Sequence, residues 1–208
     1  MLNEIKNMVI NGRAKAITGK IQEALDAGIG ASDILGVMVG AMGEVGELFT
    51  AGEFFVPEML VSAKAMKKGV EVLKPHLQSG EIGALGKCVV GTVQGDLHDI
   101  GKNLVGMLLE SAGFEVIDAG VDVAPETFVD VVRANPDTKL VGLSTLLTTT
   151  MPSMEATVAL LNAQDFRGNI KIMVGGAPIT QEFADKIGAD AYTEDAGTAV
   201  ARAKALVC

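Results

Sequence analysis

The chain contains few of the residues on which disulfide-rich, zinc-binding or nucleic-acid-binding proteins depend. It has no tryptophan, two cysteines and two histidines among 208 residues. Cys88 and Cys208 are too few for a disulfide framework or a zinc site, and we expect a reducing, cytoplasmic setting. Acidic residues outnumber basic ones by 26 to 17. The resulting net charge of −9 argues against nucleic acid as a partner, because phosphate binding needs clustered Lys and Arg.

Long hydrophobic runs are also missing. No uninterrupted apolar stretch reaches the roughly 18 residues that a membrane span requires, and the amino terminus lacks a basic segment followed by an apolar one. We therefore expect neither a membrane span nor a signal peptide. What the chain does have is aliphatic: it is 49% hydrophobic and 4% aromatic, with 25 glycines and 10 methionines. This composition is typical of a packed globular protein with room for one large or two small domains.

Residues 1–84 have the periodicity of helices only. Apolar side chains recur at helical spacing in four segments, and short polar connections separate them. Ser32 or Asp33 is expected to cap the third helix, and the fourth is expected to begin at Val56, because the proline after it suits a first helical turn. We predict a four-helix bundle over 1–84, followed by a polar linker at 75–86.

The pattern changes after this linker to alternating strands and helices. Such alternation predicts a parallel, doubly wound sheet with helices on both faces, of the flavodoxin or Rossmann-like kind, over 87–208. We predict five strands, at 87–93, 114–118, 139–145, 170–175 and near 190–193. The intervening helices are expected at 101–112, 125–134, 152–163 and 180–187, with a last one at 196–206.

Three short motifs follow three of these strands. Asp96-x-His98-x-x-Gly101 comes after the first strand, Ser144-x-Leu146 ends the third, and Gly175-Gly176 ends the fourth. The carboxyl ends of parallel strands share one edge of a sheet, where ligands bind, so these motifs should line one crevice. Glycines there would let a large ligand approach the backbone closely. A run of threonines at 148–150 offers further hydroxyls, which could also cap the helix that follows.

The three motifs in this order resemble the signature of base-off cobalamin-binding domains. The helical half, particularly 42–49 and 54–57, is similar to the cap module of methionine synthase and of small corrinoid methyl-carrier proteins. The resemblance covers nearly the whole chain. It implies that cobalamin, or a related corrinoid with its cobalt, is the cofactor.

The resemblance also implies a role for each matching residue. His98 would be the lower axial ligand of cobalt, Asp96 would hydrogen-bond its other ring nitrogen, and Thr150 would be the third member of this relay, in place of a serine. These three are the residues expected to take part in the chemistry. Asp99 could equally be a hydrogen-bonding residue of the loop. The remaining cofactor contacts implied by the resemblance are Gln94, Gly95, Asp99, Gly101, Ser144, Leu146, Thr148, Gly175 and Gly176, with Phe49 and Val56 covering the upper face.

The function implied by the resemblance is a methyl shuttle in a multi-component methyltransferase system, not an enzyme that is catalytic alone. Its expected partners are a substrate-specific corrinoid methyltransferase, a second methyltransferase with a pterin or thiol acceptor, and a reductive activase. Two alternatives stay open. One is the cobalamin subunit of an adenosylcobalamin mutase, against which the helical cap argues. The other is a cobalamin-dependent sensor, which the acidic charge disfavours where the target is DNA.

Overall fold

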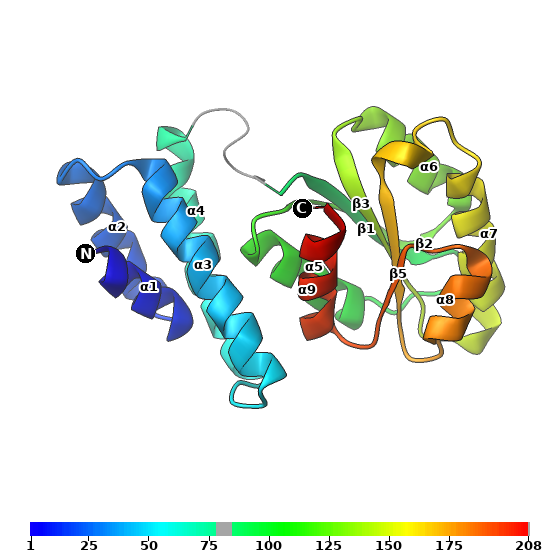
Figure 1. Ribbon diagram of the computed structural model, residues 1–208, viewed down its shortest axis with the longest axis horizontal. Helices are drawn as coiled ribbons and strands as arrows, with labels where there is room; N and C mark the ends of the chain where they lie inside the picture. The colour runs from blue at the N-terminus through cyan, green and yellow to red at the C-terminus, as the bar shows by residue number, and fades with distance from the viewer. Residues whose placement is uncertain (78–84, 208) are drawn as a thin grey trace. The chain divides into compact units, whose positions relative to one another are not determined.

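The computed structural model describes residues 1–77 and 85–207, which form two compact units (Figure 1). The first unit is helical, as its 3.6-residue periodicity predicts. Its α3 and α4 are the long helices, and α1 and α2 are shorter. The helices are α1 (Leu2–Ile10), α2 (Ala14–Asp26), α3 (Ala31–Thr50) and α4 (Val56–Leu73).

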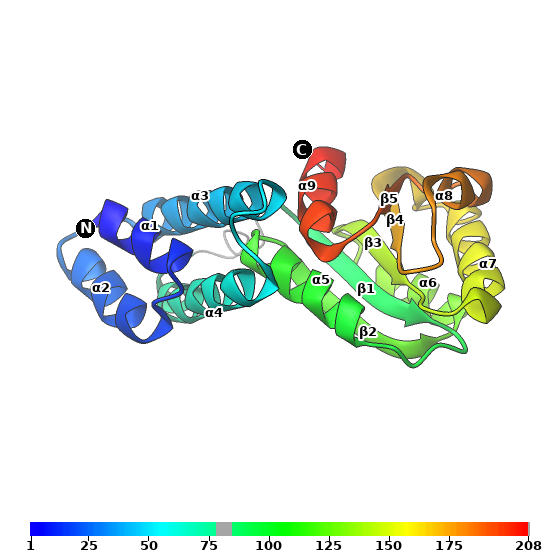
Figure 2. The ribbon, with the colours of Figure 1, turned by 90° about the horizontal axis from the view of Figure 1, so that it is seen from below.

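The helices of this unit pack in pairs around an aliphatic core. Helix α1 lies along α3, and α2 lies along α4 (Figure 2). Ile5, Ile17, Met38 and Met66 are fully or almost fully buried between them. The buried hydroxyl of Ser62 donates to the carbonyl oxygen of the last residue of α1 at 2.8 Å, which satisfies one of the acceptors left open at a helix end. The predicted four-helix bundle is confirmed.

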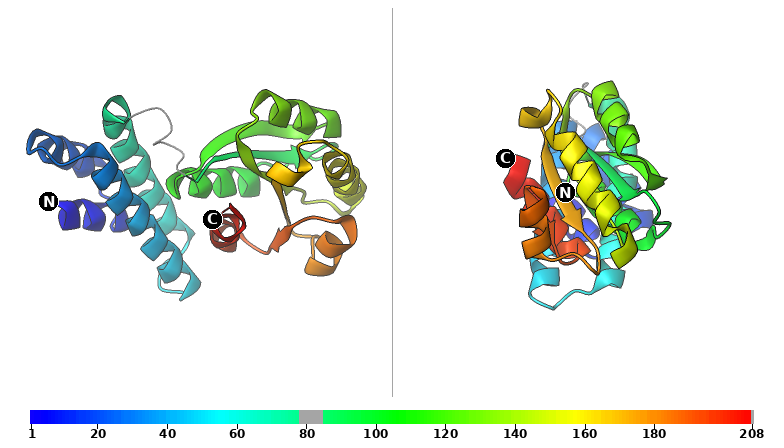
Figure 3. Two further views of the ribbon diagram at one scale, coloured as in Figure 1. Left: turned by 45° about the horizontal axis from the view of Figure 1, so that its top comes forward. Right: turned by 90° about the vertical axis from the view of Figure 1, so that its right-hand side faces the viewer.

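The second unit is a parallel sheet in the order β2-β1-β3-β4-β5. Helices α5 and α9 cover one face, and α6, α7 and α8 cover the other (Figures 1 and 3). This is the predicted doubly wound fold. The strands are β1 (Lys87–Val93), β2 (Glu115–Val123), β3 (Thr138–Ser144), β4 (Lys171–Gly175) and β5 (Ala191–Thr193), and the helices are α5 (Ile100–Ser111), α6 (Pro125–Ala134), α7 (Met151–Asn162), α8 (Gln181–Ile187) and α9 (Ala196–Val207).

The order of the strands fixes where a ligand can bind. From β1 the chain moves to β2 on one side, then crosses to β3 on the other, so the switch point lies between β1 and β3. Across this point Thr92 pairs with Ser144, and Ser144 pairs in turn with Gly175 of β4. The last residues of the three strands therefore lie at one level, which brings the three sequence motifs to the same edge.

Three local expectations differ from the structure. Strand β2 continues to Val123, beyond the predicted end at 118, because it keeps pairing with β1 through two irregularities in register. Helix α3 begins at Ala31 with Gly30 as its N-cap, so neither Ser32 nor Asp33 caps it. Of the expected linker, 78–84 lies outside the described residues, while Lys74–His76 form a 3-10 turn.

Among the helices of residues 1–77 and 85–207, none is both long enough and apolar enough to span a bilayer.

Candidate cofactor-binding site

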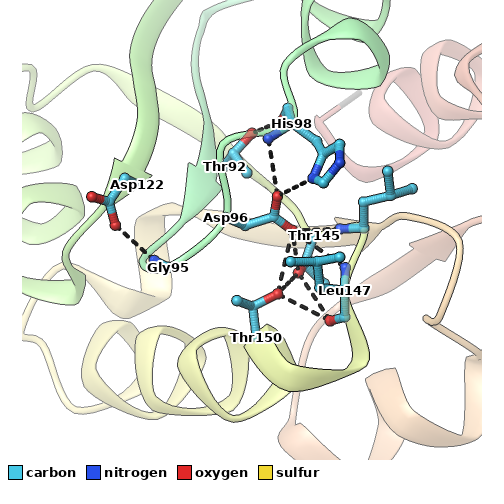
Figure 4. Close-up of polar contacts among 9 residues, drawn as sticks. Thr92, Gly95, Asp96, His98, Asp122, Thr145, Leu147 and Thr150 are labelled. Carbon is cyan, nitrogen blue, oxygen red and sulfur yellow. Dashed lines mark hydrogen bonds and ion pairs between the residues drawn. The ribbon is translucent and has the colours of Figure 1, made fainter.

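A buried carboxylate lies at the centre of the switch-point edge. Asp96, in the loop after β1, has no exposed surface. Its Oδ2 accepts hydrogen bonds from the backbone N–H of Leu146 at 2.6 Å and from the Thr145 hydroxyl at 2.9 Å. The Thr150 hydroxyl lies 3.3 Å from the same oxygen and also hydrogen-bonds Thr145 (Figure 4). The loop after β3 thus supplies hydrogen-bond donors to Oδ2 of Asp96.

These donors keep the carboxylate ionised. Burial by itself raises the pKa of Asp96, because it penalises the charged form. The hydrogen bonds outweigh this effect: the backbone N–H groups of His98 and Leu146, the His98 imidazole and the Thr145 hydroxyl together hold the pKa of Asp96 well below its usual range. A group of this kind accepts hydrogen bonds throughout the physiological pH range.

The other carboxylate oxygen holds His98. Oδ1 of Asp96 lies 2.7 Å from Nδ1 of the imidazole and accepts the backbone N–H of the same histidine at 3.0 Å. An ionised carboxylate can only accept, so Nδ1 donates to it, and in the neutral imidazole this leaves the lone pair on Nε2. The His98 side chain is 52% exposed, and no group in the described part of the chain hydrogen-bonds Nε2. The arrangement leaves Nε2 of His98 available to a ligand that is not part of the chain.

Large apolar side chains are exposed next to His98 in sequence and in the loop that bonds Asp96. Leu97 is 72% exposed and Ile100 is 84% exposed, on either side of His98 in sequence. Leu146 and Leu147 of the loop after β3, whose N–H groups bond Asp96, also expose much of their side chains. Large apolar groups gathered around a polar centre indicate a surface that a ligand or partner covers.

A pocket of about 230 Å³ opens beside this surface, between the strand ends and helices α5 and α9. It is lined by predicted site residues from all three motifs, namely Gly101, Ser144, Gly175 and Gly176. Ser144 and Thr145 face different ways: Ser144 lines the pocket and Thr145 bonds Asp96.

Gly176 lines this pocket, and the backbone around it also requires a glycine at this position. Its φ is +128°, a conformation that side-chain-bearing residues rarely adopt. A Cβ atom there would overlap the carbonyl oxygen of Thr145. The amide of Thr145 donates to the carbonyl of Gly175 at 3.2 Å, so the two loops lie backbone to backbone. Gly176 thus allows the approach that places the Thr145 hydroxyl against Asp96.

The structure brings most of the predicted site residues to this edge. Gln94, Gly95 and Asp99 are exposed in the same loop, and Thr148 is exposed in the 3-10 turn Thr148–Thr150. Thr150 is the N-cap residue of α7, but its hydroxyl makes no capping bond and instead contacts Asp96 and Thr145. The threonine run thus places Thr150 at the expected N-cap position, but its side chain does not cap the helix.

Phe49 and Val56 belong to the first unit. Phe49 is half-buried near the end of α3, and Val56 is partly exposed at the start of α4. Their expected contact with a cofactor stays a prediction.

Sequence reasoning missed Thr145 and a buried lysine. Lys102, in the first turn of α5, lines the pocket and is only 3% exposed. Its Nζ donates to both carboxylate oxygens of Asp118 at 2.6 Å and to Oδ1 of Asn103 at 2.7 Å. Burial tends to raise the pKa of Asp118, but the bond from Lys102 and the N–H of Gly120 hold it below the usual value. The sequence shows only a lysine beside Gly101 and an aspartate at the end of the strand expected at 114–118, and neither residue by itself indicates the pair.

This ion pair should respond asymmetrically to truncation. Asp118→Ala strands a buried ammonium group and should lower the free energy of unfolding by about 3 kcal/mol, whereas Lys102→Met leaves a carboxylate that is 53% exposed and should cost less than about 1 kcal/mol. Urea unfolding at pH 7 measures both. The pKa of Asp118 is lower in the folded state than in the unfolded state. Its contribution to the free energy of unfolding is therefore present above about pH 3.9 and is lost as the pH falls below that value. Equal costs for the two variants would contradict this account.

The two units and the position of the histidine define the class of protein. A helical unit precedes a doubly wound α/β domain whose switch-point edge carries an outward-facing imidazole. Comparison with known proteins then gives the family. The B12 binding domain family matches residues 86–203, and a second B12 binding domain family matches residues 1–74.

Full-length relatives agree with this match. The chain is 44% identical to dimethylamine corrinoid protein 1 of Methanosarcina acetivorans, over 100% of this chain and 97% of the relative. It is 41% identical to trimethylamine corrinoid protein 2 of Methanosarcina mazei, over 99% and 95%. A cobalamin-binding protein of Desulfitobacterium hafniense superposes with a TM-score of 0.82 at 31% identity, over 100% and 99% of the two chains. The chain belongs to the corrinoid protein family that is built on B12-binding domains.

A structure of an assembled methyltransferase is also similar. A methanol:cobalamin methyltransferase complex of Methanosarcina barkeri superposes with a TM-score of 0.85 at 29% identity, over 98% of this chain and 78% of the matched one.

Proposed function

We propose that this chain carries a methyl group on the cobalt of a corrinoid between two methyltransferases, with His98 as the lower axial ligand in a base-off, His-on complex. The observation that carries the proposal is the state of the imidazole. Nδ1 is bound by a buried, ionised carboxylate, and Nε2 faces outward with no hydrogen-bonding partner among the described residues. A carboxylate on the second nitrogen fixes the tautomer and raises the basicity of a metal-ligating histidine.

The residues at this edge fit a corrinoid in their chemistry. The described residues hold no group of three or more His, Cys, Asp and Glu side chains that could enclose a metal ion beside the imidazole. A metal at this place would need further ligands of its own, which a corrin macrocycle supplies. The exposed Leu97, Ile100 and Leu146 suit the flat, largely apolar face of such a ring. The glycine-lined pocket could accept the nucleotide tail that base-off binding displaces.

When bound, the corrinoid supplies a cobalt centre that accepts and releases a methyl group. The residues of the chain determine whether Nε2 of His98 is available to bind. Asp96 holds the proton on Nδ1 and keeps Nε2 available, while the Thr145 and Thr150 hydroxyls supply hydrogen bonds that stabilise the carboxylate. A change at these hydroxyls would therefore act on the orientation of His98 through Asp96. Residues 1–84, with Phe49 and Val56, are proposed to act as the cap over the upper face and to exclude water there.

The relatives favour methylamines as the source of the methyl group. Two of them, which match 100% and 99% of the chain, are dimethylamine and trimethylamine corrinoid proteins. This favours methyl carriage over the mutase-subunit and sensor alternatives. We propose a dimethylamine- or trimethylamine-specific corrinoid methyltransferase as the first partner, a methyltransferase with a pterin or thiol acceptor as the second, and a reductive activase that restores the active cobalt state.

The two histidines of the chain provide a matched test of the ligand. The wild type, His98→Ala and His76→Ala are reconstituted with hydroxocobalamin and desalted, and their ultraviolet–visible spectra are compared. His76 is exposed in the turn after α4, so His76→Ala should match the wild type. His98→Ala should lose the spectrum of the nitrogen-ligated corrinoid and retain less cofactor. A His98→Ala spectrum identical to that of the wild type would overturn the ligand assignment, and no retained corrinoid in any of the three would overturn cofactor binding.

A second experiment tests the methyl donor. The reduced holoprotein is mixed with a methylamine methyltransferase and with monomethylamine, dimethylamine, trimethylamine or methanol in turn, and methylation is followed by absorbance. Methylation by dimethylamine or trimethylamine but not methanol is expected. Methylation by free substrate without any methyltransferase would contradict the shuttle role.

A further inference from the structure

The carboxylate of Asp122, on β2, binds the loop after β1 that carries Asp96 and His98. Strand β2 lies on the opposite side of β1 from β3. Oδ1 of Asp122 accepts the backbone N–H of Gly95 at 2.7 Å (Figure 4). The backbone N–H of Asp122 donates to the carbonyl oxygen of Asp96 at 2.9 Å. Asp122 thus binds both the N–H group of Gly95 and the carbonyl group of Asp96. The backbone that carries the Asp96 carboxylate is fixed at two points.

The conformation of Asp122 is unusual in a way that serves this contact. Its φ is +53°, and it is the one non-glycine residue with positive φ among those that the structure describes. It lies where β2 has extra residues relative to β1: Gly91 pairs with Gly120, and Val93 pairs with Val123. Irregularities of this kind redirect side chains and are frequent beside functional sites. Backbone conformations that cost energy persist where surrounding contacts maintain them.

The loop is held from other sides as well. The Thr92 hydroxyl of β1 donates to the carbonyl of His98 at 2.8 Å, and Asn103 of α5 bonds the Asp99 carboxylate at 3.0 Å. Gly95 itself has φ +87°, so its peptide would be free to rotate without a partner. The Asp122 carboxylate is therefore the contact that sets the direction of this peptide.

We propose that Asp122 is a positioning residue for the axial ligand: by fixing the Gly95 and Asp96 peptides it aims the Asp96 carboxylate at Nδ1 and so holds His98 in the ligating orientation. The proposal rests on the proposed role of His98. It assigns no contact between Asp122 and the cofactor. Loss of the Asp122 side chain should loosen the pair of Asp96 and His98 without removing either group.

Two substitutions separate the hydrogen bond from the backbone strain. Asparagine and glycine both tolerate positive φ. Only asparagine keeps an oxygen that can accept the Gly95 N–H, and it removes the charge in the same way. Asp122→Asn therefore serves as the matched control for Asp122→Gly. The readout is His98 ligation in the reconstituted protein, measured from the ultraviolet–visible spectrum and from the nitrogen splitting in the electron paramagnetic resonance spectrum of the Co(II) form.

The ratio of His-ligated to His-free corrinoid should fall at least about fivefold in Asp122→Gly, because the side-chain hydrogen bond that holds the Gly95 N–H is lost altogether. In Asp122→Asn it should stay within about twofold of the wild type. Equal ratios in the wild type and Asp122→Gly would overturn the proposal, as would an equal loss in both variants. A wild type with no nitrogen splitting would instead refute His98 as ligand, so the two failures are distinguishable.

Discussion

Gly176→Ala is expected to be the most damaging single-methyl change in the second unit. The new Cβ would overlap the Thr145 carbonyl oxygen and would force alanine into a backbone conformation with φ of +128°. Strain of this kind and overpacking each cost about 1–3 kcal/mol, so we expect the free energy of unfolding to fall by about 3 kcal/mol or more. Relief of the overlap would move the loop after β3, which carries the donors to Asp96.

The chain offers a direct way to measure this effect. Its single tyrosine, Tyr192 of β5, packs against the core of the second unit, and there is no tryptophan, so tyrosine fluorescence during urea unfolding reports this unit. Gly106→Ala is the matched control. Gly106 lies inside α5, where an added Cβ would make ordinary contacts with Val90 and Val116, so the change should be neutral or stabilising by up to about 1 kcal/mol. Similar losses in the two variants would refute the steric explanation.

Asp96→Asn is expected to reduce both the stability of the fold and the capacity of His98 to bind a metal. The amide keeps one acceptor but places an NH₂ group against N–H and O–H donors that now bond the carboxylate, among them the Leu146 amide and the Thr145 hydroxyl. Hydrogen bonds to charged groups contribute about 1.5–3 kcal/mol, and we expect a loss of about 2–4 kcal/mol at pH 7. If the NH₂ group faces Nδ1, the imidazole must accept there, which moves its proton to Nε2 and blocks that nitrogen.

The pH dependence of this loss has a definite sign. The folded pKa of Asp96 is depressed below the unfolded value of about 3.9, so the stabilisation is complete above that value and is lost as the pH falls toward the folded pKa. The difference in stability between the wild type and Asp96→Asn should therefore shrink below about pH 4. Asp99→Asn, in an exposed carboxylate three residues away, should change stability by less than about 0.5 kcal/mol. A constant difference from pH 7 to pH 3 would be incompatible with a depressed pKa.

The amino-acid sequence by itself was sufficient for the architecture and for the centre of the site. The change from a period of 3.6 to alternating strands and helices predicted the bundle and the doubly wound sheet. Parallel strands end at a common edge, so the three motifs had to meet there. Asp96 and His98 are two residues apart in one loop, and a contact this local can be inferred without tertiary structure.

Tertiary structure decided the contacts between residues distant in sequence. Thr145, not Ser144, faces Asp96, and Gly176 is required because the Thr145 carbonyl lies against it. Gly120 and Asp122 look like turn signals, yet pairing with β1 extends the strand beyond Asp118 and brings Asp122 to Gly95. The contact of Asp118 with Lys102 joins β2 to α5 and has no local signal either. Such contacts depend on strand register and irregularities, which arise from the packing of the whole sheet. Local periodicity carries no information about them.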